Sequence, residues 1–252
     1  MEVHHHNHEP ATHHEMKNWK TYVWEFLMLF FAVFCGFLAE YQLEHTIEHD
    51  REMLYMKSLL EDLQKDTLEI NTQLKFIDNE VIPVLKKSSD LLYSEDFSDS
   101  TIRKMYEVVP KSGRFFTVSF EDRTESQLKN SGNLRLIRKK EVTDGLAAYW
   151  KTRDGLKDPI LTAFAETRGI TKELVFSLFN SNYFVGKAPF APLVKNKKLK
   201  LLSYEKVEFL KLANHVANLE TQMSGPIKNR LNLTYQKAVN LIKIIKERYD
   251  LN

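Results

Sequence analysis

The sequence contains few of the residues that build disulfides, cysteine-based metal sites and tight turns. Its 252 residues include one cysteine, Cys35, which excludes disulfides within one chain and zinc sites made from several cysteines. There are only eight glycines and seven prolines, whereas 28% of the residues are charged. This composition favours a helical protein over a turn-rich β protein. We therefore predict an all-α fold.

The chain also lacks a large excess of charge of either sign. The formal net charge is +2 and the isoelectric point is about 8.4. A nucleic-acid-binding domain usually has a strongly basic face, which this balance does not suggest. We expect no nucleic-acid partner.

One long apolar stretch is present, over residues 19–41. Between residues 21 and 39 its only charge is Glu25. A helix rises about 1.5 Å per residue, so this stretch is roughly long enough to cross the hydrocarbon layer of a bilayer. Aromatic side chains that favour the membrane–water interface lie at its ends, namely Trp19, Tyr22, Trp24 and Tyr41. We predict a transmembrane helix, with the lipid bilayer as one partner.

The flanking charges predict its orientation. Lys17 and Lys20 precede the span, and acidic residues follow it before Arg51. Basic flanks tend to stay in the cytoplasm. The run ends in Ala-Glu-Tyr, which is not a cleavage site of a signal peptide. We expect a single-pass inner-membrane protein with a cytoplasmic N-terminus and a periplasmic C-terminal domain.

The span has one face of small residues that also carries its charge. At 100° per residue the face comprises Glu25, Ala32, Gly36, Ala39 and Leu43. Ala32 and Gly36 form a small-x-x-x-small pair, which lets two membrane helices approach closely. We predict that the span packs through this face against its own copy or a partner's helix.

Residues 42–252 read as an extramembrane antiparallel helical bundle. Apolar residues with 3-4 spacing trace a bundle or coiled-coil seam along residues 53–81 and a second stripe along residues 209–249. Helices are predicted over about 42–82, 100–109, 121–131, 139–179 and 203–249. Asp99 or Ser100, and Ser203, are candidate helix caps. The sequence FFTVSF, residues 115–120, has strand composition without an obvious partner and is treated as an extended connection.

Histidines suggest a second kind of chemistry. Residues 1–18 form a polar tract that we expect to be disordered, and it contains His4, His5, His6, His8, His13 and His14. Such tracts can chelate zinc, nickel or copper. His45 and His49 lie four residues apart in an H-x-x-E-H pattern and share a helix face, so they are further candidate metal ligands. An exposed charged helix next to lipid headgroups explains the same pattern without metal.

Several of these features together resemble a known family. They are Glu25 near the start of the span, the acidic stretch EHTIEHDRE after it, the Ser-Gly-Asn-Leu-x-Leu-Ile motif at residues 131–137, and the aromatic pair Tyr149-Trp150. The chain resembles an uncharacterised family of small single-pass inner-membrane proteins of Gram-negative bacteria. The resemblance implies a topology and no chemistry. The His-rich tail and the lysine-rich stretch KNKKLK depart from the family pattern.

The sequence therefore favours a membrane-anchored helical interaction module, which is a scaffold, a sensor-like protein or an accessory subunit of an envelope complex. Two other functions stay open: metal handling through the His-rich tail, and ion coupling through Glu25, because intramembrane carboxylates are functional candidates. No nucleophile elbow or phosphate-binding glycine loop is present, so we do not expect an enzyme.

Overall fold

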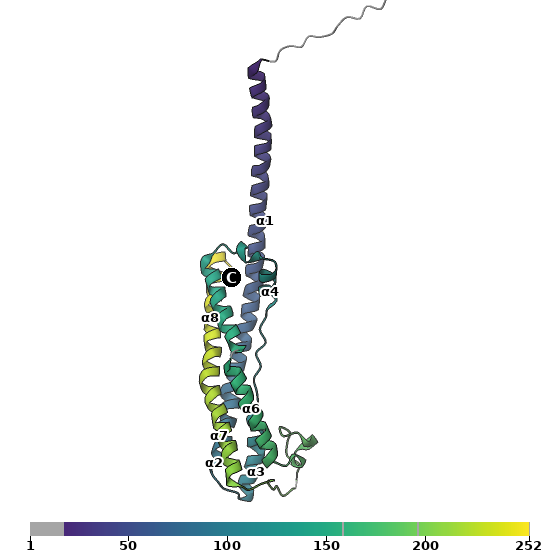
Figure 1. Ribbon diagram of the computed structural model, residues 1–252, viewed down its shortest axis with the longest axis vertical. Coiled ribbons are helices and arrows are strands. Elements are labelled where there is room, and N and C mark those ends of the chain that lie inside the picture. Colours follow the sequence, from purple (N-terminus) through teal and green to yellow (C-terminus); the bar gives the residue numbers. More distant parts are fainter. Residues whose placement is uncertain (1–17, 158, 196, 252) are drawn as a thin grey trace, which may run out of the picture. The chain divides into compact units, whose positions relative to one another are not determined.

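A computed structural model describes residues 18–251 except residues 158 and 196, and omits the side chains of residues 157–160 (Figure 1). The six histidines of the predicted tail lie outside the described residues. Within them the fold is all-α, as the composition predicted, with eight α-helices and two isolated β-bridges.

The chain divides into two units, residues 1–51 and residues 52–252. One helix, α1 (Trp19–Phe76), contributes to both. In the first unit its residues 21–39 are apolar enough and long enough to cross a membrane, and none of this stretch is buried against protein. The predicted end of the span at residue 41 followed the end of the apolar run and stays a prediction.

Three long helical segments, which can be followed in Figure 1, build the described part of the second unit. The first is the later part of α1 with the π-helical turn η1 (Ile77–Val81) and α2 (Ile82–Tyr93). The second comprises α5 (Lys140–Asp154), the 3-10 turn η4 (Gly155–Lys157) and α6 (Pro159–Leu178), and the third comprises α7 (Lys206–Gln222), the π-helical turn η7 (Met223–Ile227) and α8 (Lys228–Tyr249). The third segment packs antiparallel to the other two, with α8 on α5 and with α7 on both α6 and α2.

Both prolines within the first and third segments coincide with π-helical turns. Proline lacks an N–H group, and its ring collides with the carbonyl four residues earlier in an α-helix. The wider π turns, η1 before Pro83 and η7 around Pro226, relieve this collision without ending the helical path. For Pro83 the sequence predicts an end or a kink at residue 82, followed by a short helix over residues 83–92; in the structure the π turn lies just before this point, and the helical path continues through α2 to Tyr93.

Shorter elements connect the segments. They are α3 (Asp99–Val108), the 3-10 turn η2 (Val109–Gly113), α4 (Arg123–Asn130), the 3-10 turn η3 (Asn133–Leu136), and the 3-10 turns η5 (Ser181–Tyr183) and η6 (Val185–Lys187). Between η2 and α4 the chain is extended, as predicted for residues 115–120.

Two predicted caps are wrong by one or two residues. The cap of α3 is Ser98, whose Oγ accepts from the Thr101 backbone N–H at 3.4 Å. The cap position of α7 is Glu205, and Ser203 Oγ instead accepts the Glu205 N–H at 3.2 Å. Several neighbouring polar residues can cap each helix, so sequence alone does not choose among them. Helix α4 ends at Asn130, and two residues later Gly132 adopts a left-handed φ of 67°, which suits glycine after a helix end.

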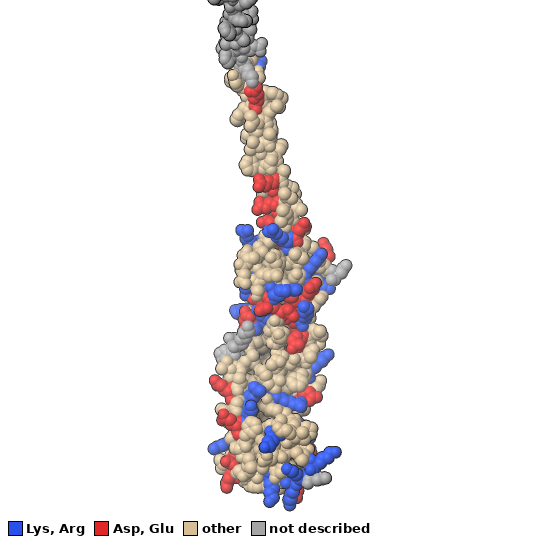
Figure 2. All heavy atoms as spheres, turned by 90° about the vertical axis from the view of Figure 1, so that its right-hand side faces the viewer, with Lys and Arg blue, Asp and Glu red and all other residues tan. Residues whose placement is uncertain are grey.

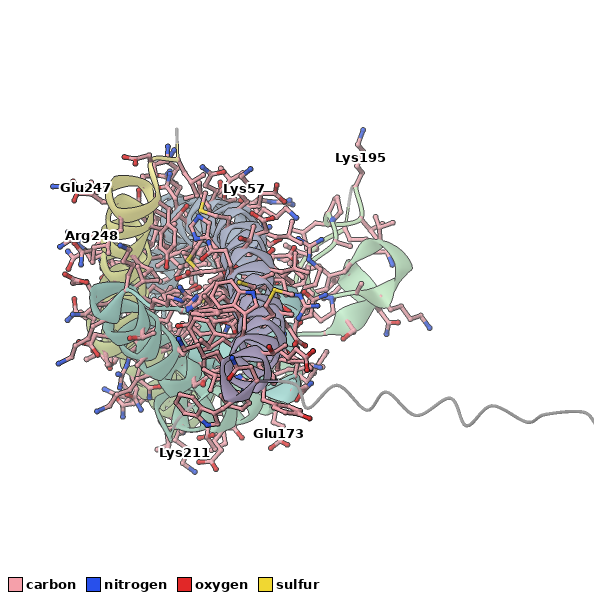
Figure 3. The ribbon with its side chains drawn as sticks, turned by 90° about the horizontal axis from the view of Figure 1, so that it is seen from above. Lys57, Glu173, Lys195, Lys211, Glu247 and Arg248 are labelled. Carbon is pink, nitrogen blue, oxygen red and sulfur yellow. The ribbon has the colours of Figure 1, made fainter. Side chains whose placement is uncertain are left out.

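The bundle interior contains two hydrophobic clusters. The first cluster is centred on Met56, Leu63, Leu146 and Ile245, and the second on Ile70, Leu85, Leu212 and Leu219. The predicted seam of residues 53–81 supplies both clusters, and all its members are buried or half-buried. Figure 3 shows charged side chains such as Lys57, Lys211 and Glu247 on the outside of the bundle.

Helices α5 and α8 approach closely at Gly145. A Cβ atom there would lie 2.9 Å from Leu241 Cδ1, and Leu241 is buried. We expect Gly145→Val to destabilise the bundle by about 1–3 kcal/mol through overpacking. Gly169→Ala on α6, where a Cβ meets nothing within 4 Å, should stabilise it by up to about 1 kcal/mol. Denaturant unfolding followed by circular dichroism measures both changes, and equal effects would contradict the close approach.

Candidate functional site: buried carboxylates and an open groove

The predicted metal ligands that the structure describes are His45 and His49. His45 Nε2 lies 2.8 Å from the Tyr41 hydroxyl, and His49 is exposed. Among residues 18–251, as far as they are described, no group of three or more His, Cys, Asp or Glu side chains is arranged to hold a metal ion.

The predicted packing face of the span is exposed throughout. Glu25, Ala32, Gly36, Ala39 and Leu43 all lie on the surface of the first unit. A Cβ atom at Gly36 would meet nothing within 4 Å. Contacts within this chain therefore do not explain why a glycine occupies that position.

Three carboxylates on α1 are buried in the bundle, a feature that the apolar periodicity did not indicate. Glu52, Asp62 and Asp66 are 3%, 4% and 2% exposed. Burying a carboxylate costs much free energy unless hydrogen bonds from the protein replace those that it made to water. The only signal in the sequence was that these acidic residues lie directly beside seam positions.

Each of these carboxylates accepts a backbone N–H from the connection between α3 and α5. Asp66 Oδ1 accepts from Glu121 at 2.8 Å, Asp62 Oδ2 from Thr124 at 3.2 Å, and Glu52 Oε1 from Arg138 at 2.8 Å. Asp62 thereby caps the N-terminus of α4. The three carboxylates fasten the connection along α1.

Two buried tyrosines complete the network. Tyr149 donates its hydroxyl to Asp66, and Tyr249 donates its hydroxyl to Glu52. Burial and the adjacent carboxylates raise the pKa of both tyrosines, so both remain protonated donors at neutral pH. Burial also raises the pKa of Asp66, although the hydrogen bonds from Tyr149 and Glu121 oppose that shift.

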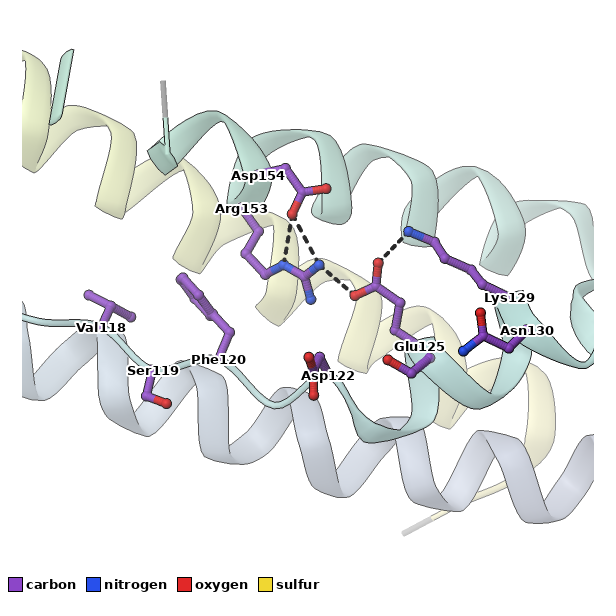
Figure 4. Close-up of a pocket in the computed structure, with 10 residues that line it drawn as sticks. Val118, Ser119, Phe120, Asp122, Glu125, Lys129, Asn130, Arg153 and Asp154 are labelled. Atoms are coloured by element: carbon purple, nitrogen blue, oxygen red, sulfur yellow. Dashed lines mark hydrogen bonds and ion pairs between the residues drawn. The ribbon is translucent and has the colours of Figure 1, made fainter. Parts of the chain in front are cut away.

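Next to this network lies a buried ion pair between α5 and α4 (Figure 4). Arg153 Nη2 is 2.5 Å from Glu125 Oε2, and each side chain is 9% exposed. Asp154 accepts from the same guanidinium at 3.1 Å, and Lys129 pairs with the other oxygen of Glu125. Burial lowers the pKa of Arg153. The hydrogen bonds and negative charges of Glu125 and Asp154 together raise it by more than burial lowers it, so the net pKa lies above the ordinary value.

Two cavities lie side by side along the extended segment. The polar cavity, about 490 Å³, is lined by the Glu125–Arg153 pair with Val118, Phe120, Asp122, Lys129 and Asp154, among others. The apolar cavity, about 230 Å³, is lined by Phe115, Phe116, Thr117, Val118, Phe120, Arg153, Leu156 and Leu161. Val118, Phe120 and Arg153 line both, so the cavities form one groove with a polar and an apolar end. Figure 2 shows acidic and basic side chains gathered on this side of the bundle.

The motif at residues 131–137 packs against α1. Asn133 Nδ2 donates to the Tyr55 hydroxyl at 2.7 Å, and Leu136 and Ile137 are buried. Trp150 lies under the Lys129 ammonium, which is 4.6 Å from the ring centroid. The motif thus has a tertiary role, because it attaches the turn after α4 to the first helix.

Comparisons of this chain with models of known protein families, with curated proteins and with solved structures find no match. The class of protein therefore follows from the fold alone. Over the residues that the structure describes, the chain is a helical protein with one candidate membrane-spanning helix.

Replacing Asp66 should reveal a pH-dependent contribution to stability. Its folded pKa is raised above the ordinary 3.8. As the pH falls from the raised value toward 3.8, the folded state takes up a proton that the unfolded state does not bind, so the native protein gains stability. Asp66→Asn cannot titrate, so the free energy of unfolding of the native chain minus that of the variant should increase on going from pH 7 to about pH 4. A difference that stays constant in denaturant titrations over this range would contradict the raised pKa.

Proposed function

We propose that this chain is a single-pass, membrane-anchored helical interaction module of the bacterial inner membrane. The observation that carries the proposal is the exposed apolar stretch of α1. Its large side chains, including Phe26, Leu29 and Phe37, are each more than half exposed in the first unit. Exposing such an apolar surface to water is unfavourable, whereas the apolar hydrocarbon of a bilayer can surround it without this cost.

The orientation and the compartment belong to the proposal as well. The lysines before the span favour a cytoplasmic N-terminus and a periplasmic bundle. The resemblance to the family of single-pass inner-membrane proteins supports the same topology. The groove beside the extended segment supports a binding role, because it joins a polar and an apolar surface on one face.

Membrane insertion provides the direct test. The full chain should stay in the membrane pellet after alkaline carbonate extraction, and a reporter that is active only in the periplasm should be active when fused after Asn252. Phe31→Arg together with Phe34→Arg should release the chain, because each arginine near the centre of a span opposes insertion by about 2.5–3.5 kcal/mol. Release of the native chain by carbonate would contradict the anchor, and a silent reporter in a stable fusion would reverse the orientation.

The span's small-residue face predicts association in the membrane. Since a Cβ at Gly36 meets nothing in a single copy, Gly36→Leu should not disturb the chain itself. It should instead separate two helices that pack through this face, and weaken crosslinking of spans in membranes. Phe37→Leu, at an exposed position outside the face, is the matched control. Association of Gly36→Leu equal to that of the native span would remove this face as an interface.

A further inference from the structure

The extended segment of residues 115–120 has the side-chain pattern of a β-strand. Phe116 is 3% exposed, and Val118 and Phe120 are half-buried, whereas Thr117 and Ser119 are exposed and Phe115 is 40% exposed with its ring stacked on Phe164. Alternation of this kind is typical of a strand that lies with one face on a core. In the part of the chain that the structure describes, no second strand pairs with it.

The backbone of this segment is open to a partner. Within the described residues, no N–H or C=O group of residues 115–120 forms a hydrogen bond with the protein. The next residue, Glu121, donates its N–H to Asp66 on α1. Successive residues of a strand direct their backbone groups to opposite edges, so the amides of Phe116, Val118 and Phe120 point away from α1. An unpaired strand edge is a template for another chain.

The groove follows this open edge. Its apolar end, about 230 Å³, is smaller than most small-molecule sites and has the scale of a single large side chain. Its polar end begins at Phe120 and Arg153, which also line the apolar end. Side chains at positions i and i+2 of an extended peptide point to the same side about 6.6–6.8 Å apart, so one peptide can place side chains in both ends.

The charges at the polar end favour a basic side chain there. Five charged residues line it: three acids, Asp122, Glu125 and Asp154, and two bases, Lys129 and Arg153. The bases are engaged by Glu125 and Asp154. Among the described residues no cation pairs with Asp122, which is exposed. A lysine or arginine from a partner would complement its charge.

We propose that residues 115–120 bind an extended segment of a partner protein by β-strand addition, with an apolar residue in the apolar end of the groove and, two residues further along, a lysine or arginine beside Asp122. This inference rests on the proposed function as an interaction module and specifies its site. Main-chain hydrogen bonds supply affinity, and the two ends of the groove supply selectivity.

The test uses the full chain in detergent micelles and a fluorescent peptide, fluorescein-Thr-Val-Thr-Val-Thr-Lys-Thr-amide with the dye on its N-terminus, and binding is followed by fluorescence anisotropy. The peptide should bind at micromolar to submillimolar concentration. A peptide with glutamate in place of lysine should bind about fivefold more weakly or worse. N-methylation of one set of alternate residues should abolish binding while N-methylation of the other set preserves it, because only one edge of the peptide pairs.

A charge reversal in the protein tests the polar end. Asp122→Lys should invert the preference, so that the glutamate peptide binds better than the lysine peptide. Asp144→Lys, at an exposed acidic residue on α5 that does not line the groove, is the control and should leave the preference unchanged.

Three outcomes would overturn the proposal. They are no binding of any peptide up to 1 mM, equal binding of both N-methylated forms, or equal binding of the lysine and glutamate peptides to the native chain. The results of the carbonate-extraction and crosslinking tests described above do not depend on any of these outcomes. Loss of peptide binding with intact membrane insertion rejects this site alone, whereas release from the membrane rejects the proposed function.

Discussion

Ile70→Asp should unfold the bundle or nearly so. Ile70 is 0% exposed and lies in the second hydrophobic cluster, packed among the long helical segments. The substitution removes a buried aliphatic side chain, which costs about 2–5 kcal/mol, and buries a carboxyl group without a partner, which adds several kcal/mol more. The sum, about 5 kcal/mol or more, approaches the total stability of an ordinary domain.

Leu68 provides a matched control two residues away on the same helix. It is 69% exposed, so Leu68→Asp should change the free energy of unfolding by less than about 0.5 kcal/mol. Denaturant titration of the full chain in micelles, followed by circular dichroism, measures both variants. If Ile70→Asp unfolds at the same denaturant concentration as Leu68→Asp, the stripe that the 3-4 spacing indicated is not the buried face.

Arg153→Met should also be strongly destabilising, for an electrostatic reason. It leaves Glu125 buried at 9% exposure with Lys129 as its remaining partner. Removing one partner of a buried ion pair costs about 3–5 kcal/mol, because the other charge stays without full compensation. Lys129 is 47% exposed and screened by water, so it offsets only part of that loss.

A double variant separates charge from packing. Arg153→Met combined with Glu125→Leu removes both charges and keeps apolar volume, so it should recover most of the lost stability. The fluorescence of Trp150, which lies beside Lys129, reports on this region once Trp19 and Trp24 are replaced by phenylalanine. A double variant as unstable as Arg153→Met alone would mean that Arg153 acts through packing on Phe120 and Tyr149, whose ring centroids lie 6.0 and 5.9 Å from its guanidinium carbon.

The apolar periodicity predicted the helices and their buried faces well for a local reason. Residues at 3-4 spacing share a helix face whatever surrounds them, so the seam containing Met56, Ile70 and Ile77 could be read before its partners were known. The sequence predicted the exact ends of the helices less well. Ser98 caps α3 where Asp99 or Ser100 was expected, since several adjacent polar residues meet the same requirement.

The candidate site could not be read in this way. Glu52, Asp62 and Asp66 are indistinguishable in sequence from the exposed acidic residues around them, because their partners are backbone amides from 55 to 86 positions away. The pairing of Arg153 with Glu125 likewise depends on the return of the chain along α1. Local composition does not encode such contacts.

By itself the sequence determined the helical class, the apolar stretch of residues 21–39 and the stripes that the bundle buries, since these depend on side-chain type and spacing along one helix. The tertiary structure alone decided which carboxylates are buried, which face of residues 115–120 packs inward, and that its backbone edge lies open beside a groove. The physical reason is that burial and hydrogen-bond satisfaction are properties of the whole packed chain, and a single segment does not specify what covers it.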